Sequence, residues 1–397
     1  MYLTNEEERT LGGEYGETLR KATEILVALG DIYGADQLIP VKSAQIAGVS
    51  YKTIGDAGLE WISDLTGTVR VPAILNPAGM DLKRWQDMGI SETFARKQLE
   101  VIQAYEDLGV RPMCTCTPYY LEGFSAKYGD HLAWSESSAV SYANSVIGAR
   151  TNREGGPSAL AAALVGKTAN YGYHLDENRQ PTVSVSVECE LSDSDYGALG
   201  YLVGKDVGNR VPLFNMNARP VPDNLKSLGA AMAASGAVAL YHVKGITPDI
   251  RQMDVEQPDE TIVVEREQID EVYTSILGED GGADTDIAAL GCPHASVAEL
   301  ETIADRLANR TVTRQLWVCT SREVAEGHPD LVRRIEKSGA MVLCDTCMVV
   351  SPATERYQSM IVNSGKAFAY LPGMCHVAAR MGDVDECIRK VCDPDEN

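Results

Sequence analysis

The sequence predicts an α/β fold with mainly parallel sheets flanked by helices. Stretches rich in Val, Ile and Leu alternate with helical stretches at residues 68–117 and again at 286–347, which is typical of parallel sheets covered on both faces. A chain of 397 residues, 44% hydrophobic and 23% charged, is long enough for two or three lobes. We therefore predict lobes at residues 1–154, 155–277 and 278–397.

The N-terminal region is expected to begin with a long helix. Thr4 followed by Glu7 has the spacing of a capping box, and the amphipathic pattern continues to about Leu29. An apolar stretch then runs into residues 48–50, Gly-Val-Ser. A glycine at that place suits a loop whose backbone approaches a ligand, and a connecting turn explains it equally well.

Residues 68–117 read as a βαβ unit. The strand 68–75 ends at Asn76 and Pro77, a helix opened by Ser91 follows, and a second strand covers 110–117. The C-terminal third repeats this alternation, with strands predicted at 286–292, 313–319 and 340–347, a helix opened by the capping box of Ser296 and Glu299, and a helix over 324–339. Between these regions, the Gly- and Ala-rich residues 155–277 form the predicted middle lobe, and residues 278–286 are expected to be a linker.

Charge and motifs exclude several classes of function. The formal net charge of −22, from 35 basic and 57 acidic residues, would repel a nucleic-acid backbone. The sequence contains no GxGxxG, HExxH or GxSxG motif, which argues against nicotinamide, zinc-protease and hydrolase chemistry. Without a signal-like start or an apolar stretch of about 18 residues, the protein is expected to be cytoplasmic.

Cysteines recur where the predicted strands end. Ten cysteines in a chain without a signal peptide are better explained as thiols, metal ligands or buried apolar residues than as disulfides. Ligands of parallel sheets bind at the carboxyl ends of the strands. The cysteines at such ends are Cys114, Cys116, Cys292, Cys319, Cys344 and Cys347. Three of them on a four-iron cluster would leave one iron open, whereas a zinc site or buried apolar cysteines explain the pattern equally.

Two further features could bind an anion. The stretch 134–156 is dense in hydroxyl, amide and guanidinium groups, which bind carboxylates or phosphates, although a solvated and capped helix has a similar composition. Its polar members include Glu136, Asn144, Ser145, Arg150, Asn152 and Arg153. Lys366 follows a glycine, where its ammonium could meet an anionic substrate or simply lie on the surface.

Several stretches resemble the large subunit of the aconitase X family, nearly from end to end. The resemblance is carried by residues 14–61 and 134–174 and by LNPAGMDL, CTCTPYYL, ALGCPHAS and NSGKAFAYLPG. It implies an aconitase-like multi-lobe architecture with a cluster site in the cleft between lobes. It also implies a [4Fe-4S] cluster with one open iron, held by Cys116, Cys292 and Cys344, with Cys347 as the alternative to Cys344.

The resemblance further implies a hydro-lyase. Archaeal members dehydrate (R)-5-phosphomevalonate to trans-anhydromevalonate 5-phosphate in a mevalonate pathway to isoprenoids, and the N-terminal stretch resembles theirs. Bacterial relatives dehydrate cis-3-hydroxy-L-proline, which is the first alternative. A zinc-stabilised binding subunit without chemistry of its own is the second.

Substrate contacts and a partner are implied in the same way. The expected substrate contacts are Gly48, Val49, Ser50, Asn76, Pro77, Asn144, Ser145 and Lys366. The catalytic base is expected to be a serine on a separate small subunit, a swivelling domain for which a chain ending at Asn397 has no room. The expected assembly is therefore a heterodimer or a larger complex.

Overall fold

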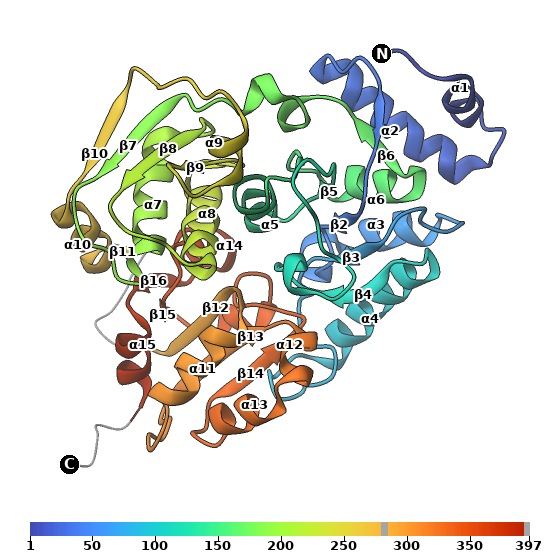
Figure 1. Cartoon of the computed structure of the whole chain (residues 1–397). Helices are drawn as coiled ribbons and strands as arrows, with labels where there is room; N and C mark the ends of the chain where they lie inside the picture. The colour runs from blue at the N-terminus through green and yellow to red at the C-terminus, as the bar shows by residue number, and fades with distance from the viewer. Residues whose placement is uncertain (279–284, 393–397) are drawn as a thin grey trace.

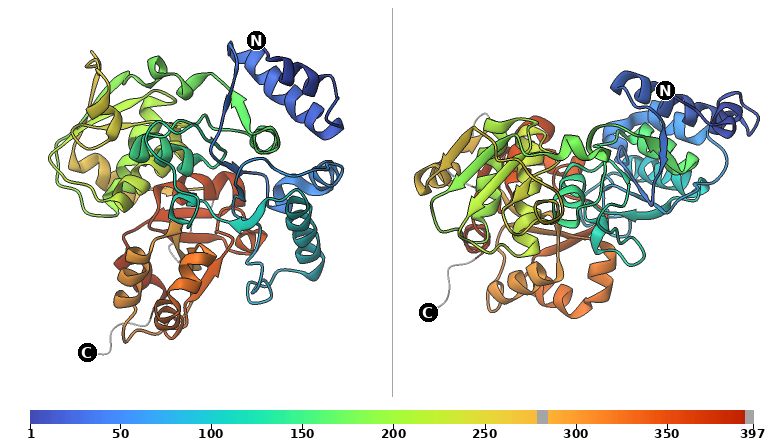
Figure 2. Two further views of the ribbon diagram at one scale, coloured as in Figure 1. Left: turned by 45° about the vertical axis from the view of Figure 1, so that its right-hand side comes forward. Right: turned by 45° about the horizontal axis from the view of Figure 1, so that its top comes forward.

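The computed structural model describes residues 1–278 and 285–392, and in it three lobes meet around a common junction (Figure 1). The N-terminal lobe is drawn from blue to green, the middle lobe in yellow-green and the C-terminal lobe from orange to red. The two turned views of Figure 2 show the same arrangement. Most of the predicted linker 278–286 lies outside the described residues, and the predicted lobe boundaries stay predictions.

A four-stranded parallel sheet forms the N-terminal lobe, in the order β4-β3-β2-β5. Its strands are β2 (Ala44–Ile46), β3 (Ala73–Leu75), β4 (Arg111–Cys114) and β5 (Ala133–Trp134). A separate antiparallel pair joins β1 (Leu38–Pro40) to β6 (Lys167–Ala169). The helices are α1 (Asn5–Leu11), α2 (Glu17–Tyr33), α3 (Tyr51–Ser63), α4 (Glu92–Asp107), α5 (Ser137–Tyr142) and α6 (Gly156–Val165), with short turns η1 (Pro118–Tyr120), η2 (Ala143–Ile147), η3 (Gly172–His174) and η4 (Asp176–Arg179).

The predicted βαβ unit is confirmed, whereas the predicted long first helix is wrong. The Thr4–Glu7 capping box opens α1 as expected, but α1 ends at Leu11 and α2 begins only at Glu17. Between them the backbone takes φ values of 84° and 103° at Gly13 and Gly16, outside the helical region. The amphipathic pattern continued through this break, so periodicity alone did not reveal it.

The middle lobe also contains a four-stranded parallel sheet, in the order β10-β7-β8-β9. Its strands are β7 (Val183–Val187), β8 (Pro212–Met216), β9 (His242–Val243) and β10 (Thr261–Val264). Its helices are α7 (Asp195–Val207), α8 (Pro222–Gly236), α9 (Pro248–Gln252) and α10 (Arg266–Thr274). The Gly and Ala residues of the predicted region 155–277 lie partly in α6, which belongs to the N-terminal lobe, and partly in α7 and α8, which pack against each other.

The C-terminal lobe is built on a six-stranded sheet in the order β11-β16-β15-β12-β13-β14, parallel except for the β11–β16 pair. Its strands are β11 (Ile276–Leu277), β12 (Ile287–Ala295), β13 (Gln315–Thr320), β14 (Met341–Cys344), β15 (Ser359–Val362) and β16 (Ala378–Met381). Its helices are α11 (Val297–Arg306), α12 (Arg322–Gly327), α13 (Pro329–Glu336), α14 (Gly365–Cys375) and α15 (Val384–Val391), with the turn η5 (Pro352–Arg356). The single helix predicted over 324–339 is two, because Pro329 begins a new helix after His328.

The carboxyl ends of the N-terminal and C-terminal sheets face one junction. Ala78, just after β3, forms an isolated parallel bridge with Thr346, just after β14, and its N–H donates to the Asp345 carbonyl at 2.7 Å. Helix α14 of the C-terminal lobe packs against α8 of the middle lobe and so closes the third side. Among the described residues, no helix has the length and apolar character needed to span a membrane.

Candidate active site

Three buried thiols from separate loops share one neighbourhood at this junction. Cys116 follows β4, Cys292 lies at the register shift of β12, and Cys347 follows β14. Cys292 interacts electrostatically with both of the others, and the ammonium of Lys366 acts on all three. Burial raises the pKa of each thiol, to about 12 for Cys116, and the nearby Lys366 ammonium opposes that rise.

The donor set fits an iron–sulfur cluster. Cys116, Cys292 and Cys347 form no disulfide, and no three Cys, His, Asp or Glu side chains among the described residues converge closely enough to hold one metal ion. A four-iron cluster is a larger body that takes thiolate ligands, so it suits cysteines that share a neighbourhood without touching. Three such thiols and a nearby ammonium therefore form a candidate cluster site.

Cys344 lies in different surroundings. Its backbone N–H donates to the Asp81 carboxylate at 2.8 Å. Burial raises the pKa of its thiol to about 12, and the charged groups that act on it most are Asp81 and Arg322. Cys116 and Cys292 thus interact with Cys347, whereas the charged groups that act most on Cys344 are Asp81 and Arg322.

Cys319 is a fourth thiol close to this group. It lies within β13 with no exposed surface, and it interacts with Cys347 and Cys292. The carbonyl oxygen of Cys319 would lie 2.0 Å from a Cβ atom added at Gly291, whose φ is 86°. A glycine is therefore required where β12 passes β13, one residue before Cys292.

A buried ion pair stands beside the thiols. The Lys366 ammonium binds the Glu136 carboxylate, and it also donates to the Ser138 hydroxyl at 3.2 Å. The amide of Asn76 donates to the other Glu136 oxygen at 2.9 Å. Only 6% of Lys366 is exposed, so the surface-lysine alternative does not hold.

The pair keeps both groups charged. Burial would raise the pKa of Glu136, but Lys366 and Asn76 outweigh it and hold the pKa at about 2. Burial would likewise lower the pKa of Lys366, yet the Glu136 carboxylate raises it above its usual range. Three elements supply these groups, since Asn76 follows β3, Glu136 caps α5 and Lys366 lies in the first turn of α14.

The loop containing Gly48, Val49 and Ser50 lies at the same junction, directly before α3. The Ser50 hydroxyl donates to the Val350 carbonyl at 3.1 Å, three residues beyond Cys347. The Val49 carbonyl accepts from the Gln98 amide at 2.8 Å. This loop and Asn76–Pro77 follow neighbouring strands, β2 and β3, so the structure brings them together as the sequence led us to expect.

Asn144 and Ser145, two of the expected substrate contacts, both have hydrogen-bond partners within the protein. The Asn144 amide donates to the carbonyls of Thr151 and Ala239, both at 2.9 Å, and its oxygen accepts from the Thr151 N–H at 3.0 Å. The Ser145 hydroxyl accepts from the Tyr241 N–H at 2.9 Å. Both side chains are buried and hold η2 against the middle lobe.

Carboxylates and a guanidinium fasten the loop of Cys344 and Cys347 to the N-terminal lobe. Arg322 binds both Asp81, at 2.7 Å, and Asp345. Asp345 has a φ of 63°, in the left-handed region that few residues other than glycine adopt. Neither Asp81 nor Arg322 was among the sequence candidates, although Asp81 lies within LNPAGMDL.

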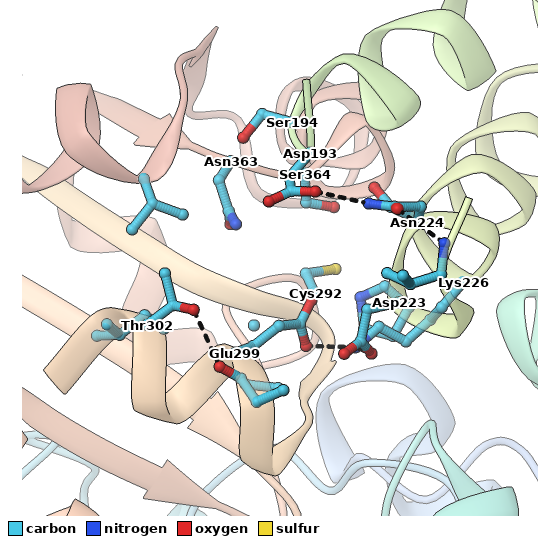
Figure 3. A pocket seen from close by; sticks show the side chains of 18 residues that line it. Asp193, Ser194, Asp223, Asn224, Lys226, Cys292, Glu299, Thr302, Asn363 and Ser364 are labelled. Atoms are coloured by element: carbon cyan, nitrogen blue, oxygen red, sulfur yellow. Dashed lines mark hydrogen bonds and ion pairs between the residues drawn. The ribbon is translucent and has the colours of Figure 1, made fainter. Parts of the chain in front are cut away.

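A cavity of about 200 Å³ reaches Cys292 from the side of the middle lobe (Figure 3). The side chains labelled in Figure 3 come from α8, α11, the segments before α7 and α14, and β12, which supplies Cys292. Lys226 lies against Asp223, at 3.0 Å, and Glu299. The ammonium is thus already paired, and the rest of the charged lining is acidic, which does not suit an anionic substrate.

Comparison with known proteins decides the family. The aconitase X first, second and third domain models match residues 1–177, 181–274 and 285–393. The chain belongs to the aconitase X family. The crystal structure of the holo-form of aconitase X from Thermococcus kodakaraensis matches this aconitase X chain with a TM-score of 0.91 and 48% identity. The match covers 98% of this chain and 100% of that one.

Curated relatives share most of their length with the aconitase X chain. The phosphomevalonate dehydratase large subunits of Methanosarcina mazei and Methanothermobacter thermautotrophicus are 67% and 52% identical, over 98% of this chain and 97% and 98% of theirs. The cis-3-hydroxy-L-proline dehydratase of Pseudomonas aeruginosa is 33% identical over 95% of this chain and 68% of its own length. The words "large subunit" imply a smaller partner for the first two proteins.

Proposed function

We propose that this chain is the large subunit of a phosphomevalonate dehydratase, a hydro-lyase that removes water from (R)-5-phosphomevalonate to give trans-anhydromevalonate 5-phosphate. The observation that carries the proposal is the 67% identity over nearly the whole chain to a relative of that name. Relatives named cis-3-hydroxy-L-proline dehydratase are more distant, at 33% and 30% identity. The phosphorylated substrate is therefore favoured over the imino acid.

The proposed cofactor is a [4Fe-4S] cluster held by Cys116, Cys292 and Cys347. We propose Cys347 in place of Cys344 because Lys366 acts on the thiol of Cys347 as it does on those of Cys116 and Cys292. The backbone N–H groups of Val349 and Val350 also favour its thiolate. With three protein ligands, one iron stays open and supplies a Lewis acid for a leaving hydroxyl group.

Residues of this chain bind and orient the substrate. The Lys366 ammonium, held by Glu136, and the Asn76 amide are placed to bind its carboxylate. The backbone of Gly48, Val49 and Ser50 lies at the amino end of α3, where N–H groups favour a phosphate, and Pro77 follows the neighbouring strand β3. Asn144 and Ser145 remain proposed substrate contacts, and within the protein the Asn144 amide donates to the carbonyls of Thr151 and Ala239 while the Ser145 hydroxyl accepts from the Tyr241 N–H.

The proton and the hydroxyl group leave by separate routes. The C3–O bond breaks with its electron pair on oxygen, the C2–H bond supplies the pair for the new double bond, and the products balance as alkene plus water. The base that takes the C2 proton is assigned to the small subunit, a swivelling domain that covers the junction. The described part of this chain offers Glu136 there, but Lys366 and Asn76 hold its pKa too low for a base at neutral pH.

The test is anaerobic co-expression with the candidate small subunit, followed by iron and sulfide analysis. Loss of water is then assayed with (R)-5-phosphomevalonate and with cis-3-hydroxy-L-proline in parallel. Turnover of the phosphorylated substrate with iron and sulfide bound supports the proposal. Turnover of the imino acid alone would replace the substrate, and zinc without sulfide would overturn the dehydratase altogether.

A further inference from the structure

His294 bonds through every polar atom it has. Its backbone N–H donates to the Cys116 sulfur at 3.2 Å, its Nδ1 lies 2.9 Å from the Thr115 hydroxyl, and its Nε2 lies 2.9 Å from the Thr346 carbonyl oxygen. Its own carbonyl accepts from the Lys226 ammonium at 3.5 Å. The residue has no exposed surface.

The partners fix the tautomer of the ring. The Thr346 oxygen is a carbonyl and only accepts, so Nε2 carries the hydrogen and donates it. Nδ1 is then the acceptor, and the Thr115 hydroxyl donates to it. The Thr115 oxygen in turn accepts from the Thr117 N–H at 3.1 Å, which completes a chain of bonds in one direction.

These bonds join the three loops that carry the thiols. Thr115 directly precedes Cys116, Thr346 directly precedes Cys347, and His294 itself lies two residues after Cys292. Lys226 holds the same backbone from the middle lobe. No other described side chain is recorded with hydrogen bonds to both neighbours, Thr115 and Thr346, of the two distant cysteines.

We propose that His294, on the loop of Cys292, is the positioning residue that sets the spacing of Cys116, Cys292 and Cys347, because its imidazole bonds to the loops of the other two. The proposal rests on the proposed cluster site for its purpose, but every hydrogen bond that carries it lies within this chain. The three loops come from two lobes. Without the ring, they lose the buried hydrogen bonds that fix their separation. Each such bond, once broken, leaves a buried partner unsatisfied.

The first test labels thiols in the cluster-free chain. The parent and His294→Ala are treated with iodoacetamide, and each cysteine is followed by peptide mass spectrometry. His294→Ala is expected to raise the labelling rates of Cys116, Cys292 and Cys347 by about tenfold, the effect of losing one buried hydrogen bond. Cys387, buried in α15 of the same lobe, is expected to keep its rate.

Two matched variants separate positioning from general loosening. His242→Gln removes another buried ring whose Nε2 bonds to a carbonyl, that of Arg179 at 2.8 Å, and is expected to leave the three rates unchanged. His294→Gln keeps a donor for the Thr346 carbonyl and is expected to restore part of the protection. If His294→Ala does not fold, His294→Gln is compared with His242→Gln instead. The labelling rates of Cys116, Cys292 and Cys347 are then expected to rise in His294→Gln and not in His242→Gln.

The second test follows the reconstituted cluster in the complex with the small subunit. Loss of its visible absorbance to an iron chelator is expected to be about tenfold faster in His294→Ala than in the parent, with His294→Gln between them. Equal thiol rates in parent and variant, or an equal rise at Cys387, would overturn the positioning role. If the parent takes up no iron or sulfide, the proposed cluster is overturned instead. A selective rise in the labelling of the three cysteines in His294→Ala would still support the role of His294 in joining their loops.

Discussion

Glu136 and Lys366 form a buried ion pair that joins the N-terminal lobe to the C-terminal lobe. The Ser138 hydroxyl contacts both partners, donating to the Glu136 carboxylate at 3.2 Å and accepting from Lys366 at the same distance. Both members of the pair also act on the three proposed ligand thiols: the ammonium lowers the pKa of each thiol and the carboxylate raises it. One pair therefore connects the stability of the junction with the electrostatics of the site.

Removing one partner of this pair should cost much stability. Lys366→Met leaves the Glu136 carboxylate buried and uncompensated, so we expect the free energy of unfolding to fall by about 3–5 kcal/mol. The double variant Glu136→Gln/Lys366→Met leaves no charge and should be more stable than Lys366→Met. Urea unfolding of the cluster-free chain measures both. As a control, Lys83→Met breaks the exposed pair with Glu326 and should change little.

The same pair predicts the response to acid. The pKa of Glu136 is lowered from 4.5 to about 2, so its stabilisation is complete above pH 4.5 and is lost as the pH falls toward 2, by up to about 3 kcal/mol. In Lys366→Met the unpaired carboxyl should instead gain from protonation, so its stability should rise as the pH falls. Chemical denaturation at several acidic pH values tests this. If the free energy of unfolding changed with pH in the same direction in parent and variant, the pairing would be contradicted.

The ligand assignment can be tested with four matched cysteine variants. Cys116→Ala and Cys347→Ala should abolish turnover and lower bound iron and sulfide after anaerobic reconstitution. Cys344→Ala and Cys319→Ala also remove buried thiols, but Lys366 is not among the groups that most affect the pKa of either thiol. Both variants should keep the cluster. Full iron content in Cys347→Ala together with loss in Cys344→Ala would restore Cys344 as the ligand.

Gly291 should tolerate no side chain. A Cβ there meets the Cys319 carbonyl oxygen at 2.0 Å, so Gly291→Ala has to displace β12 just before Cys292. We expect a loss of about 3 kcal/mol or more and a lower iron content, since overpacking adds to the strain of a positive φ. Gly208→Ala provides the control, because its φ of 60° is also positive but nothing lies within 4 Å of the added atom. Equal losses in thermal unfolding would argue against the close approach.

Arg322 should be needed for the docking of the two lobes. Arg322→Met leaves Asp81 and Asp345 as two buried carboxylates without a cation, which should lower the free energy of unfolding by about 3–5 kcal/mol. Arg322→Lys keeps the charge but not the forked geometry, and an intermediate loss is expected. Chemical denaturation of the three proteins gives the order, and a parent-like Arg322→Met would show that the cluster of charges is dispensable.

Local signals in the sequence predicted much of the fold. The capping boxes at Thr4–Glu7 and Ser296–Glu299 form as expected, because their bonds join residues three apart. The βαβ unit around α4 and the mainly parallel sheets also agree with the pattern of apolar residues. The break between α1 and α2 was missed because glycines can be accommodated within a helix, and sequence alone does not give their φ.

The site was less predictable because long-range contacts define it. Cys344 and Cys347 lie three residues apart and the sequence does not choose between them, whereas in the structure the Cys344 N–H bonds to Asp81 and the Lys366 ammonium acts on the Cys347 thiol. Asn144 resembled an anion-binding amide, yet its partners Thr151 and Ala239 are supplied by tertiary packing. His294 lies within ALGCPHAS, but the partners of its ring, Thr115 and Thr346, are far from it in the sequence.

The junction draws on both ends of the sequence, from Gly48 to Lys366. During synthesis the ribosome must therefore release nearly the whole chain before the pocket exists, although the N-terminal lobe can fold earlier as a unit. A cofactor placed there is loaded into a finished protein rather than built in as the chain emerges. For the proposed cluster, delivery of iron and sulfur is therefore a step after translation.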